Sequence, residues 1–157
     1  MAEPVPPSAG RPDREYPARP IVGVGAVVVK DSDVLVVQRG SQPGYGQWSI
    51  PGGAVELGET VREAAAREVA EECGIEIDII DVIEILDRAM RDKDGRVRYH
   101  YVLIDFVARY RSGELHAGSD ILAARWVPIA ELAGVGLPAI TLAVMHKGIE
   151  RLDVEQQ

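Results

Sequence analysis

The hydrophobic and polar positions of the chain divide into segments with different periods. Two apolar runs, IVGVGAVVV from Ile21 and VLVVQRG after the DSD turn, predict buried strands. Residues 60–73 contain neither glycine nor proline and are rich in alanine and glutamate, so they predict the clearest helix of the chain. IEIDIIDVIEIL, from Ile75, and VRYHYVLIDFVARY, after an RDKDG turn, are rich in β-branched and aromatic residues and predict two long strands.

The second long strand alternates between polar and apolar positions. Arg96, Arg98 and His100 alternate with Val97, Tyr99 and Tyr101, as a strand with one solvated and one buried face requires. The shorter segments predict an extended piece at WSIP, a turn at PGG, a last strand at ARWVP, a short helix at PIAEL and a final helix opened by Pro138. This order predicts an α/β fold in which a mixed β-sheet lies between helices.

The chain divides into an N-terminal arm, residues 1–20, and one domain, residues 21–157. The arm is rich in proline and almost free of large apolar side chains, which predicts an extended segment rather than a packed element. Strand exchange with a partner subunit is the functional alternative for the arm. The domain has an ordinary length for a single hydrophobic core.

Composition and charge exclude several classes of function. Lys+Arg number 17 against 25 Asp+Glu, a formal net charge of -8, which disfavours a nucleic-acid binder but leaves small phosphorylated substrates open if a cation reverses the local field. The lone Cys73 cannot form an internal disulfide or a cysteine-based zinc site. The sequence shows neither a membrane-spanning apolar run nor a signal peptide, so we expect a cytoplasmic protein that does not bind membranes.

The predicted helix carries acidic residues on one face. Residues three and four apart share a helix face, so Glu68, Glu71 and Glu72 lie together, and an apolar stripe of Ala65, Ala66, Val69 and Cys73 faces away from them. A solvated charged face is the simpler interpretation of these glutamates, and the spacing of Glu63 and Arg67 allows the i,i+4 ion pair of an ordinary surface helix.

The glycine turn before the helix favours a second interpretation. Gly52 and Gly53 follow Pro51, and a glycine backbone can approach a ligand or an ion closely. Carboxylate and carbonyl oxygens suit Mg²⁺ or Mn²⁺, which keep water ligands for substrate phosphates. A glycine-rich turn that leads into a carboxylate-lined helix therefore indicates a site for a complex of a cation and a phosphate.

Residues 53–75, GAVELGETVREAAAREVAEECGI, fit the pattern G-x5-E-x7-R-E-U-x-E-E-x-G-U, in which U is apolar, at every position. The chain thereby resembles the Nudix hydrolase family, whose signature box this is. The similarity extends to GVGAVVV, LVVQRG, PGYGQWSIPGG and ARWVPIAEL, and covers nearly everything from Ile21 to about Leu132. The resemblance implies an α/β/α sandwich and a hydrolase in which water attacks a phosphorus atom of a nucleoside diphosphate linked to another moiety.

The resemblance also implies roles for the box residues. Glu68, Glu71 and Glu72 would bind Mg²⁺ or Mn²⁺, and the carbonyl of Gly52 or Gly53 would add a ligand. Two further residues would orient these glutamates, Arg67 by ion pairs and Glu59 from behind them. The general base differs between family members and is open here between a box glutamate and the two acids of the SGELHAGSD loop, Glu114 and Asp120.

The substrate class stays open between several small nucleotides. RGSQPGYGQWSIPGG and YVLIDFVA most resemble bacterial ADP-ribose pyrophosphatases, so ADP-ribose or a nucleotide sugar is favoured. One branch of these enzymes has a proline about fifteen residues after the box, where this chain has Met90. A nucleoside triphosphate pyrophosphatase is the alternative. A non-catalytic nucleotide sensor is the rival from another class, and retention of all three glutamates disfavours it.

Five residues outside the box are candidates for substrate binding. Arg39 could contact a phosphate, and four aromatic side chains could stack on a base, although packing in the core is the simpler role for each aromatic residue. The four are Tyr45, Trp48, Tyr99 and Tyr101. The family frequently forms dimers, and the proline-rich arm is compatible with a homodimer.

Overall fold

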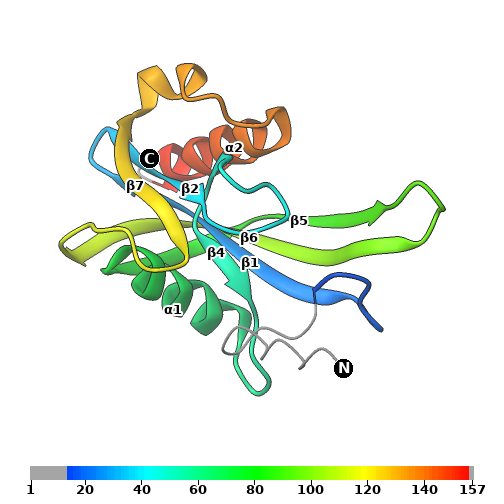
Figure 1. Cartoon of the computed structure of the whole chain (residues 1–157). Coiled ribbons are helices and arrows are strands. Elements are labelled where there is room, and N and C mark those ends of the chain that lie inside the picture. Colours follow the sequence, from blue (N-terminus) through cyan, green and yellow to red (C-terminus); the bar gives the residue numbers. More distant parts are fainter. Residues whose placement is uncertain (1–13, 156–157) are drawn as a thin grey trace.

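The structure, a computed structural model, describes residues 14–155 (Figure 1). Most of the predicted arm therefore lies outside the described residues. The elements are β1 Ile21–Lys30, β2 Asp33–Arg39, β3 Trp48–Ser49, β4 Gly52–Ala54, α1 Val61–Cys73, β5 Ile75–Arg91, β6 Val97–Gly113, β7 Ile121–Pro128, the 3₁₀ helix η1 Ile129–Gly134 and α2 Ala139–Glu155. No described helix is long and apolar enough to cross a membrane.

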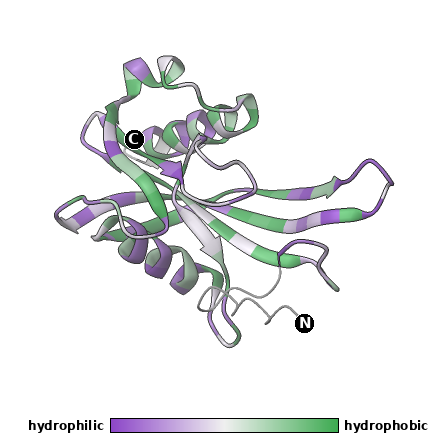
Figure 2. Cartoon of the chain, in the orientation of Figure 1, coloured by the Kyte–Doolittle hydropathy of each residue, from purple (hydrophilic) through white to green (hydrophobic). Residues whose placement is uncertain are grey.

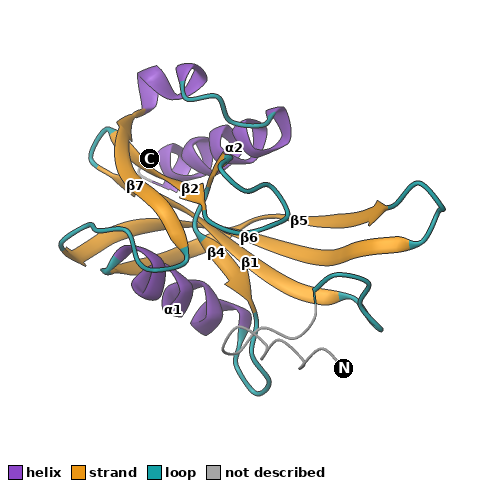
Figure 3. Cartoon of the chain, in the orientation of Figure 1, coloured by secondary structure: helices purple, strands orange, loops and turns teal. Residues whose placement is uncertain are grey.

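The strands form one mixed sheet between helices, which confirms the predicted fold class. The order is β3-β2-β1-β6-β5, with β7 on β2 and β4 on β1. Among the strand pairs of residues 14–155, β1 and β6 run parallel and the others are antiparallel. Helix α1 covers one face of the sheet, and α2 with η1 covers the other (Figures 1 and 3).

The continuous apolar run of β1 follows from burial on both faces. Val27 and Val29 belong to the core cluster under α2, which includes Val144 and Met145. The alternate residues of β1 pack with α1 instead, Ala26 and Val28 against Val69 and Cys73. A strand that is covered on both faces shows no alternation of polar and apolar residues. Segments that face solvent, such as the outward side of α1 and the β5–β6 turn, are hydrophilic instead (Figure 2).

The sequence of α1 specifies where the helix begins and ends. Thr60 caps its N-terminus, with the Thr60 hydroxyl accepting from Glu63 N at 3.1 Å and the Glu63 carboxylate accepting from Thr60 N at 2.9 Å. Gly74, with φ of 73°, ends the helix in the left-handed conformation. Because the Glu63 carboxylate serves this cap, the ion pairs of Arg67 go to other residues.

The PGG segment is not the turn that the sequence predicts. Its glycines open strand β4, which pairs antiparallel with β1 through Gly25↔Gly52 and Val24↔Gly53. A Cβ atom at position 52 would collide with the carbonyl oxygen of Val24, so only glycine allows this close approach. Strand β6 pairs with one edge of β1, so β2 and β4 both pair with the opposite edge of β1. Pro51, which joins β3 to β4, also lies at this edge, because its carbonyl accepts from Ala26 N at 3.0 Å.

Residues 14–20 have no regular secondary structure and lie against the β5–β6 hairpin. The backbone N–H of Tyr16 donates to the carbonyl of Arg98 at 2.7 Å, and its hydroxyl donates to Asp92 at 2.8 Å. The guanidinium of Arg96 lies 4.5 Å from the centre of the Tyr16 ring. This part of the predicted arm is therefore docked on its own chain.

Candidate active site

The predicted site forms where α1 passes β4. Glu68 and Glu72 point from α1 toward the glycines of β4, and the backbone N–H of Gly52 donates to Glu72 Oε2 at 3.2 Å. A Cβ atom at position 53 would collide with the carboxylate of Glu68. The glycine pair therefore leaves room for carboxylate groups directly beside the backbone.

Arg67 connects the acidic residues of this region. Its Nε and Nη2 donate to the two carboxylate oxygens of Glu59 at 2.6 Å and 3.0 Å, a bidentate pair. Its Nη1 donates to Glu68 at 3.0 Å and to Glu71 at 3.1 Å. Nη2 also donates to the carbonyl of Ala54 at 3.1 Å, so one guanidinium links α1 to β4 and to the loop before the helix.

The three helix glutamates differ in environment. The side chain of Glu68 is 15% exposed and that of Glu71 is 60% exposed, while Glu72 lies half-buried under the loop of residues 114–120. In residues 14–155 no three acidic, histidine or cysteine side chains stand as a group that could hold a metal ion. The structure thus brings Glu68 and Glu72 together at β4 and turns Glu71 toward Arg67.

Burial disfavours the negative charge of the two glutamates at β4. It raises the pKa of Glu72 to about 8, and the neighbouring Glu68 adds to the rise, while the Gly52 N–H and the positive charge of Arg39 oppose it. Burial likewise raises the pKa of Glu68, against the effect of Arg67. The hydrogen bond from Arg67, in contrast, lowers the pKa of Glu59. A carboxylate with such a raised pKa is one that a cation would stabilise.

The two acids of the SGELHAGSD loop lie at different distances from the site. Asp120 is close enough for its charge to raise the pKa of Glu72. In the described part of the chain, no hydrogen bond or ion pair joins the exposed Glu114 to the helix glutamates, and its carbonyl lies 3.3 Å from His116 Nδ1. The loop therefore brings Asp120, and not Glu114, to Glu72.

Backbone bonds hold this loop against the end of α1. His116 N donates to the Cys73 carbonyl at 3.0 Å, and Gly118 N donates to the Glu72 carbonyl at 2.7 Å. These bonds satisfy carbonyl groups that the last turn of a helix leaves open. The sequence pattern does not predict this contact, because no spacing rule joins a loop to a helix end that lies so far back in the chain.

The substrate-binding candidates outside the box are scattered. Arg39 ends β2, lies near Glu72 and donates from Nε to the carbonyl of Pro43 at 2.8 Å. Tyr45 is 59% exposed in the following loop, and Trp48 has the guanidinium of Arg125 4.7 Å from its ring centre. The remaining two, Tyr99 and Tyr101, are buried on β6, which fits the packing alternative.

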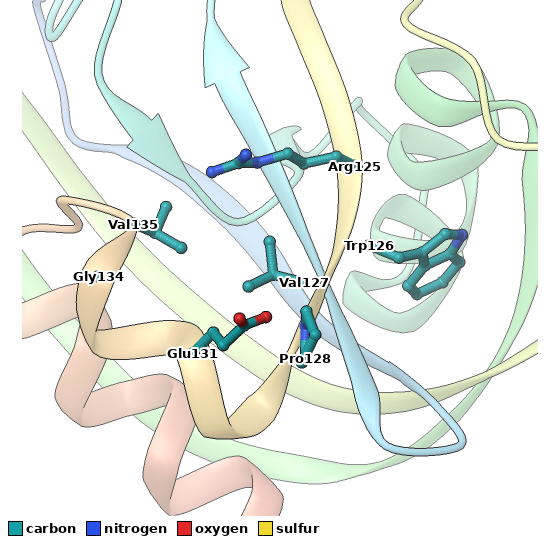
Figure 4. A pocket seen from close by; sticks show the side chains of 7 residues that line it. All are labelled: Arg125, Trp126, Val127, Pro128, Glu131, Gly134 and Val135. Carbon is teal, nitrogen blue, oxygen red and sulfur yellow. The ribbon is translucent and has the colours of Figure 1, made fainter.

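Two hollows lie on the α2 side of the sheet. The larger, about 530 Å³, is formed by β7 and η1 and contains none of the predicted site residues. Figure 4 shows its lining, with the Trp126 ring pointing away from the other side chains. The smaller, about 90 Å³, lies between the sheet and the start of α2 and is lined by Ile50, next to β4, and by Asp105 of β6.

Asp105, a buried charged residue on β6, is not among the site residues that the sequence predicts. It is 7% exposed, and burial together with the nearby Glu84 raises its pKa to about 6. The only signal in the sequence is a single acidic residue inside the apolar run YVLIDFVA.

Comparison with known proteins places the chain among proteins with this fold. The family model for the NUDIX domain matches residues 19–148. An ADP-ribose pyrophosphatase of Methanocaldococcus jannaschii is 34% identical over 113 residues. The matched residues are 72% of this chain and 64% of that protein, so the match spans less than two thirds of the relative's length. A Mycobacterium tuberculosis protein provisionally named 8-oxo-dGTP diphosphatase 2 is 49% identical over 116 residues, 71% of this chain and 76% of that protein. The crystal structure of a MutT NUDIX hydrolase from Burkholderia pseudomallei superposes with a TM-score of 0.70 at 29% identity, covering 82% of this chain and 98% of that one.

Proposed function

The chain belongs to the NUDIX domain family, and we propose that it is a cation-dependent hydrolase that cleaves the pyrophosphate linkage of a small nucleotide. The observation that carries this proposal is the placement of the Glu68 and Glu72 carboxylates against the glycines of β4. The acidic face of an ordinary surface helix points into solvent. Here two carboxylates point instead at a backbone segment where residues larger than glycine would not fit.

The residues at this place fit a divalent cation. The site offers carboxylate and carbonyl oxygens, which are the ligand atoms that Mg²⁺ and Mn²⁺ prefer. Gly53 leaves space beside Glu68 that a larger residue would fill. Glu68 and Glu72 would hold the ion, with Glu71 and a carbonyl of Gly52 or Gly53 as further ligands. Glu71 is exposed and bound to Arg67 by a single hydrogen bond, so its carboxylate can exchange that bond for a cation.

A cation bound here would neutralise charge on the phosphate oxygens and acidify a bound water. The chain's own residues do the positioning. Arg67 fixes the direction of Glu68 while Glu59 fixes Arg67, and such supporting contacts typically matter by about 10–100-fold in activity. Arg39, at the end of β2, supplies positive charge near Glu72 and is suited to contact a terminal phosphate.

The proton of the attacking water needs a carboxylate as acceptor. Asp120 is the better candidate of the two loop acids, because it is exposed and its charge acts on Glu72. In the described part of the chain, no hydrogen bond or ion pair joins Glu114 to the helix glutamates. We therefore place the proton on an Oδ atom of Asp120, with a box glutamate as the alternative acceptor.

Two groups of substrates have support. ADP-ribose or a nucleotide sugar comes first, in line with the name of the archaeal relative. A nucleoside triphosphate is the alternative, which the name of the mycobacterial relative favours at a higher identity. Both groups offer the same pyrophosphate linkage to the site and differ in the base and in the group beyond the phosphates.

A substrate panel tests the reaction. The full chain is incubated with Mg²⁺ or Mn²⁺ and ADP-ribose, nucleotide sugars and nucleoside triphosphates, and products are separated by chromatography. Cleavage of at least one compound, abolished by a chelator, supports the proposal. Tight nucleotide binding with no product from any compound would instead indicate a nucleotide sensor, and Glu72→Gln should then leave that binding unchanged.

A further inference from the structure

The loop of residues 114–120 lies so close to the end of α1 that position 118 has no room for a side chain (Figure 1). A Cβ atom at Gly118 would lie 2.5 Å from the carbonyl oxygen of Glu71 and 3.1 Å from that of Glu72. Gly118 N donates to the same Glu72 carbonyl at 2.7 Å. The backbone of a helix cannot move aside as the end of a flexible side chain can, so only glycine allows the loop to lie here.

Two other glycines allow close contacts of the same loop. The His116 ring lies against Gly74, the residue that ends α1, and a Cβ atom at position 74 would collide with it. A Cβ atom at Gly40, directly after β2, would lie 2.6 Å from the carbonyl oxygen of Asp120. The loop is therefore in contact with the end of α1 on one side and with the end of β2 on the other.

Apolar side chains anchor the loop near both of its ends. Leu115 packs against the core cluster that includes Val69 and Cys73 of α1. Ile121, the first residue of β7, is 8% exposed in the same cluster and pairs with Arg39, the last residue of β2. A segment with buried apolar anchors and backbone hydrogen bonds belongs to the stable part of a fold, so the chain itself sets the conformation of this loop.

These contacts determine where Asp120 lies. It follows Gly118 by two residues and directly precedes β7, between the last turn of α1 and the end of β2. From this geometry we infer that Gly118 is a positioning residue. It holds Asp120 beside Glu72 before a substrate binds, so that the loop is a fixed part of the site and not a lid that closes. The inference rests on the proposed function, in which Asp120 accepts the proton of the attacking water.

Gly118→Ala should lower kcat because it displaces the proton acceptor. The added methyl group forces the loop away from α1, and Asp120 moves with the loop, whereas Glu68 and Glu72 keep their places beside β4. A displacement of about 1 Å in an active site can cost about 100-fold in rate. We therefore expect kcat to fall about 10- to 100-fold, while KM and the affinity for Mn²⁺ change by less than about 3-fold.

A double-mutant cycle distinguishes positioning from a general loss of structure. If Gly118 acts through Asp120, adding Gly118→Ala to Asp120→Asn lowers kcat by no more than about 3-fold further, because the positioned group is already lost. Gly40→Ala displaces the Asp120 carbonyl from the opposite side and should show the same pattern. Gly134→Ala adds a methyl group where nothing lies within 4 Å, and it should keep wild-type kcat.

Amide hydrogen exchange tests the fixed loop without turnover. The amides of His116 and Gly118, which donate to carbonyls at the end of α1, are measured by NMR in the full wild-type chain without cation or nucleotide. We expect both to exchange at least about 100-fold more slowly than amides of an unstructured peptide. Thermal melting verifies that the variants fold, and if Gly118→Ala does not fold, Gly40→Ala and the wild-type exchange rates provide the test.

Unprotected amides at His116 and Gly118, additive losses of kcat in the double variant, or a loss of Mn²⁺ affinity as large as the loss of kcat would overturn the inference. Protected amides in a chain that hydrolyses no nucleotide would contradict the proposed reaction and still support the fixed position of the loop. Turnover by a chain with unprotected amides would support the reaction and contradict the positioning role of Gly118.

Discussion

Arg67 donates hydrogen bonds to both carboxylate oxygens of Glu59, from Nε at 2.6 Å and from Nη2 at 3.0 Å. These two hydrogen bonds fix the orientation of the guanidinium group, and its third nitrogen, Nη1, then donates to Glu68 at 3.0 Å. A lysine has a single ammonium group and cannot make these contacts at once.

Arg67→Lys should therefore lower kcat by about 10–100-fold with little change in fold, because Glu68 loses its orienting contact. Steady-state kinetics on the substrate found in the panel, with circular dichroism for the fold, measures this. Arg62→Lys, an exposed arginine of the same helix outside the Glu59 cluster, is the control and should keep its activity. Equal activity of the two variants would show that the bidentate contact between Arg67 and Glu59 has no catalytic consequence.

Gly53→Ala places a methyl group into the carboxylate of Glu68. Glu68 must move, so the variant should bind Mn²⁺ about 10-fold or more weakly, by analogy with the loss of a contact that orients a metal ligand. Calorimetric titration with Mn²⁺ measures the affinity. Gly134→Ala adds the same methyl group where nothing lies within 4 Å, and it should bind Mn²⁺ like the wild type. Unchanged affinity in Gly53→Ala would argue against Glu68 as a ligand.

The stability of the protein without cations should fall as pH rises from about 5 to 8 because of Glu72. Burial raises the pKa of this carboxyl from 4.5 to about 8 in the folded state, so within this window the folded chain holds a proton that the unfolded chain has released. Glu72→Gln removes this contribution. The raised pKa of Asp105, about 6, acts in the same direction in both proteins.

Urea denaturation in a chelator at the two ends of this pH window measures the effect as a free energy of unfolding. The decrease from the acidic to the alkaline end should be smaller in Glu72→Gln than in the wild type. Parallel decreases in the two proteins would mean that Glu72 is not protonated preferentially in the folded state.

Asp120→Asn should reduce kcat more strongly than Glu114→Gln. General-base catalysis typically contributes about 10²–10⁴-fold, and only Asp120 of the two acids lies near Glu72. The pH profile of kcat for both variants distinguishes loss of a base from loss of binding, because a lost base also removes the acidic limb of the profile. A larger defect in Glu114→Gln would reverse the assignment.

Local rules account for most of the elements. Helix α1 carries its own start and end signals in Thr60, Glu63 and Gly74, and its apolar stripe packs on the sheet as the spacing predicts, with Ala64 as an additional buried residue. The alternation around Tyr99 and Tyr101 corresponds to buried and exposed faces of β6. These features depend on neighbours two to four residues away, which a sequence pattern records.

The features that the sequence does not predict depend on distant contacts. The sequence predicts a turn at Gly52 and Gly53 because glycine permits one. They form a strand instead, because the missing side chain of Gly52 lets its backbone approach that of Val24 and Gly25 in β1. Spacing alone puts three glutamates on one face, but it does not show that Glu71 is hydrogen-bonded to Arg67 while Glu72 is hydrogen-bonded to Gly52. Asp105 gains its environment from elements that lie far from it in the sequence.

The central claim is that Glu68 and Glu72 hold a divalent cation against the glycines of β4. Anomalous diffraction from a crystal of the full chain soaked in Mn²⁺ measures this directly. The account predicts an anomalous peak bounded by the carboxylates of Glu68 and Glu72 and by a carbonyl of Gly52 or Gly53. A crystal with no manganese peak at that place, in which Glu68 and Glu71 remain bound to Arg67, would contradict it.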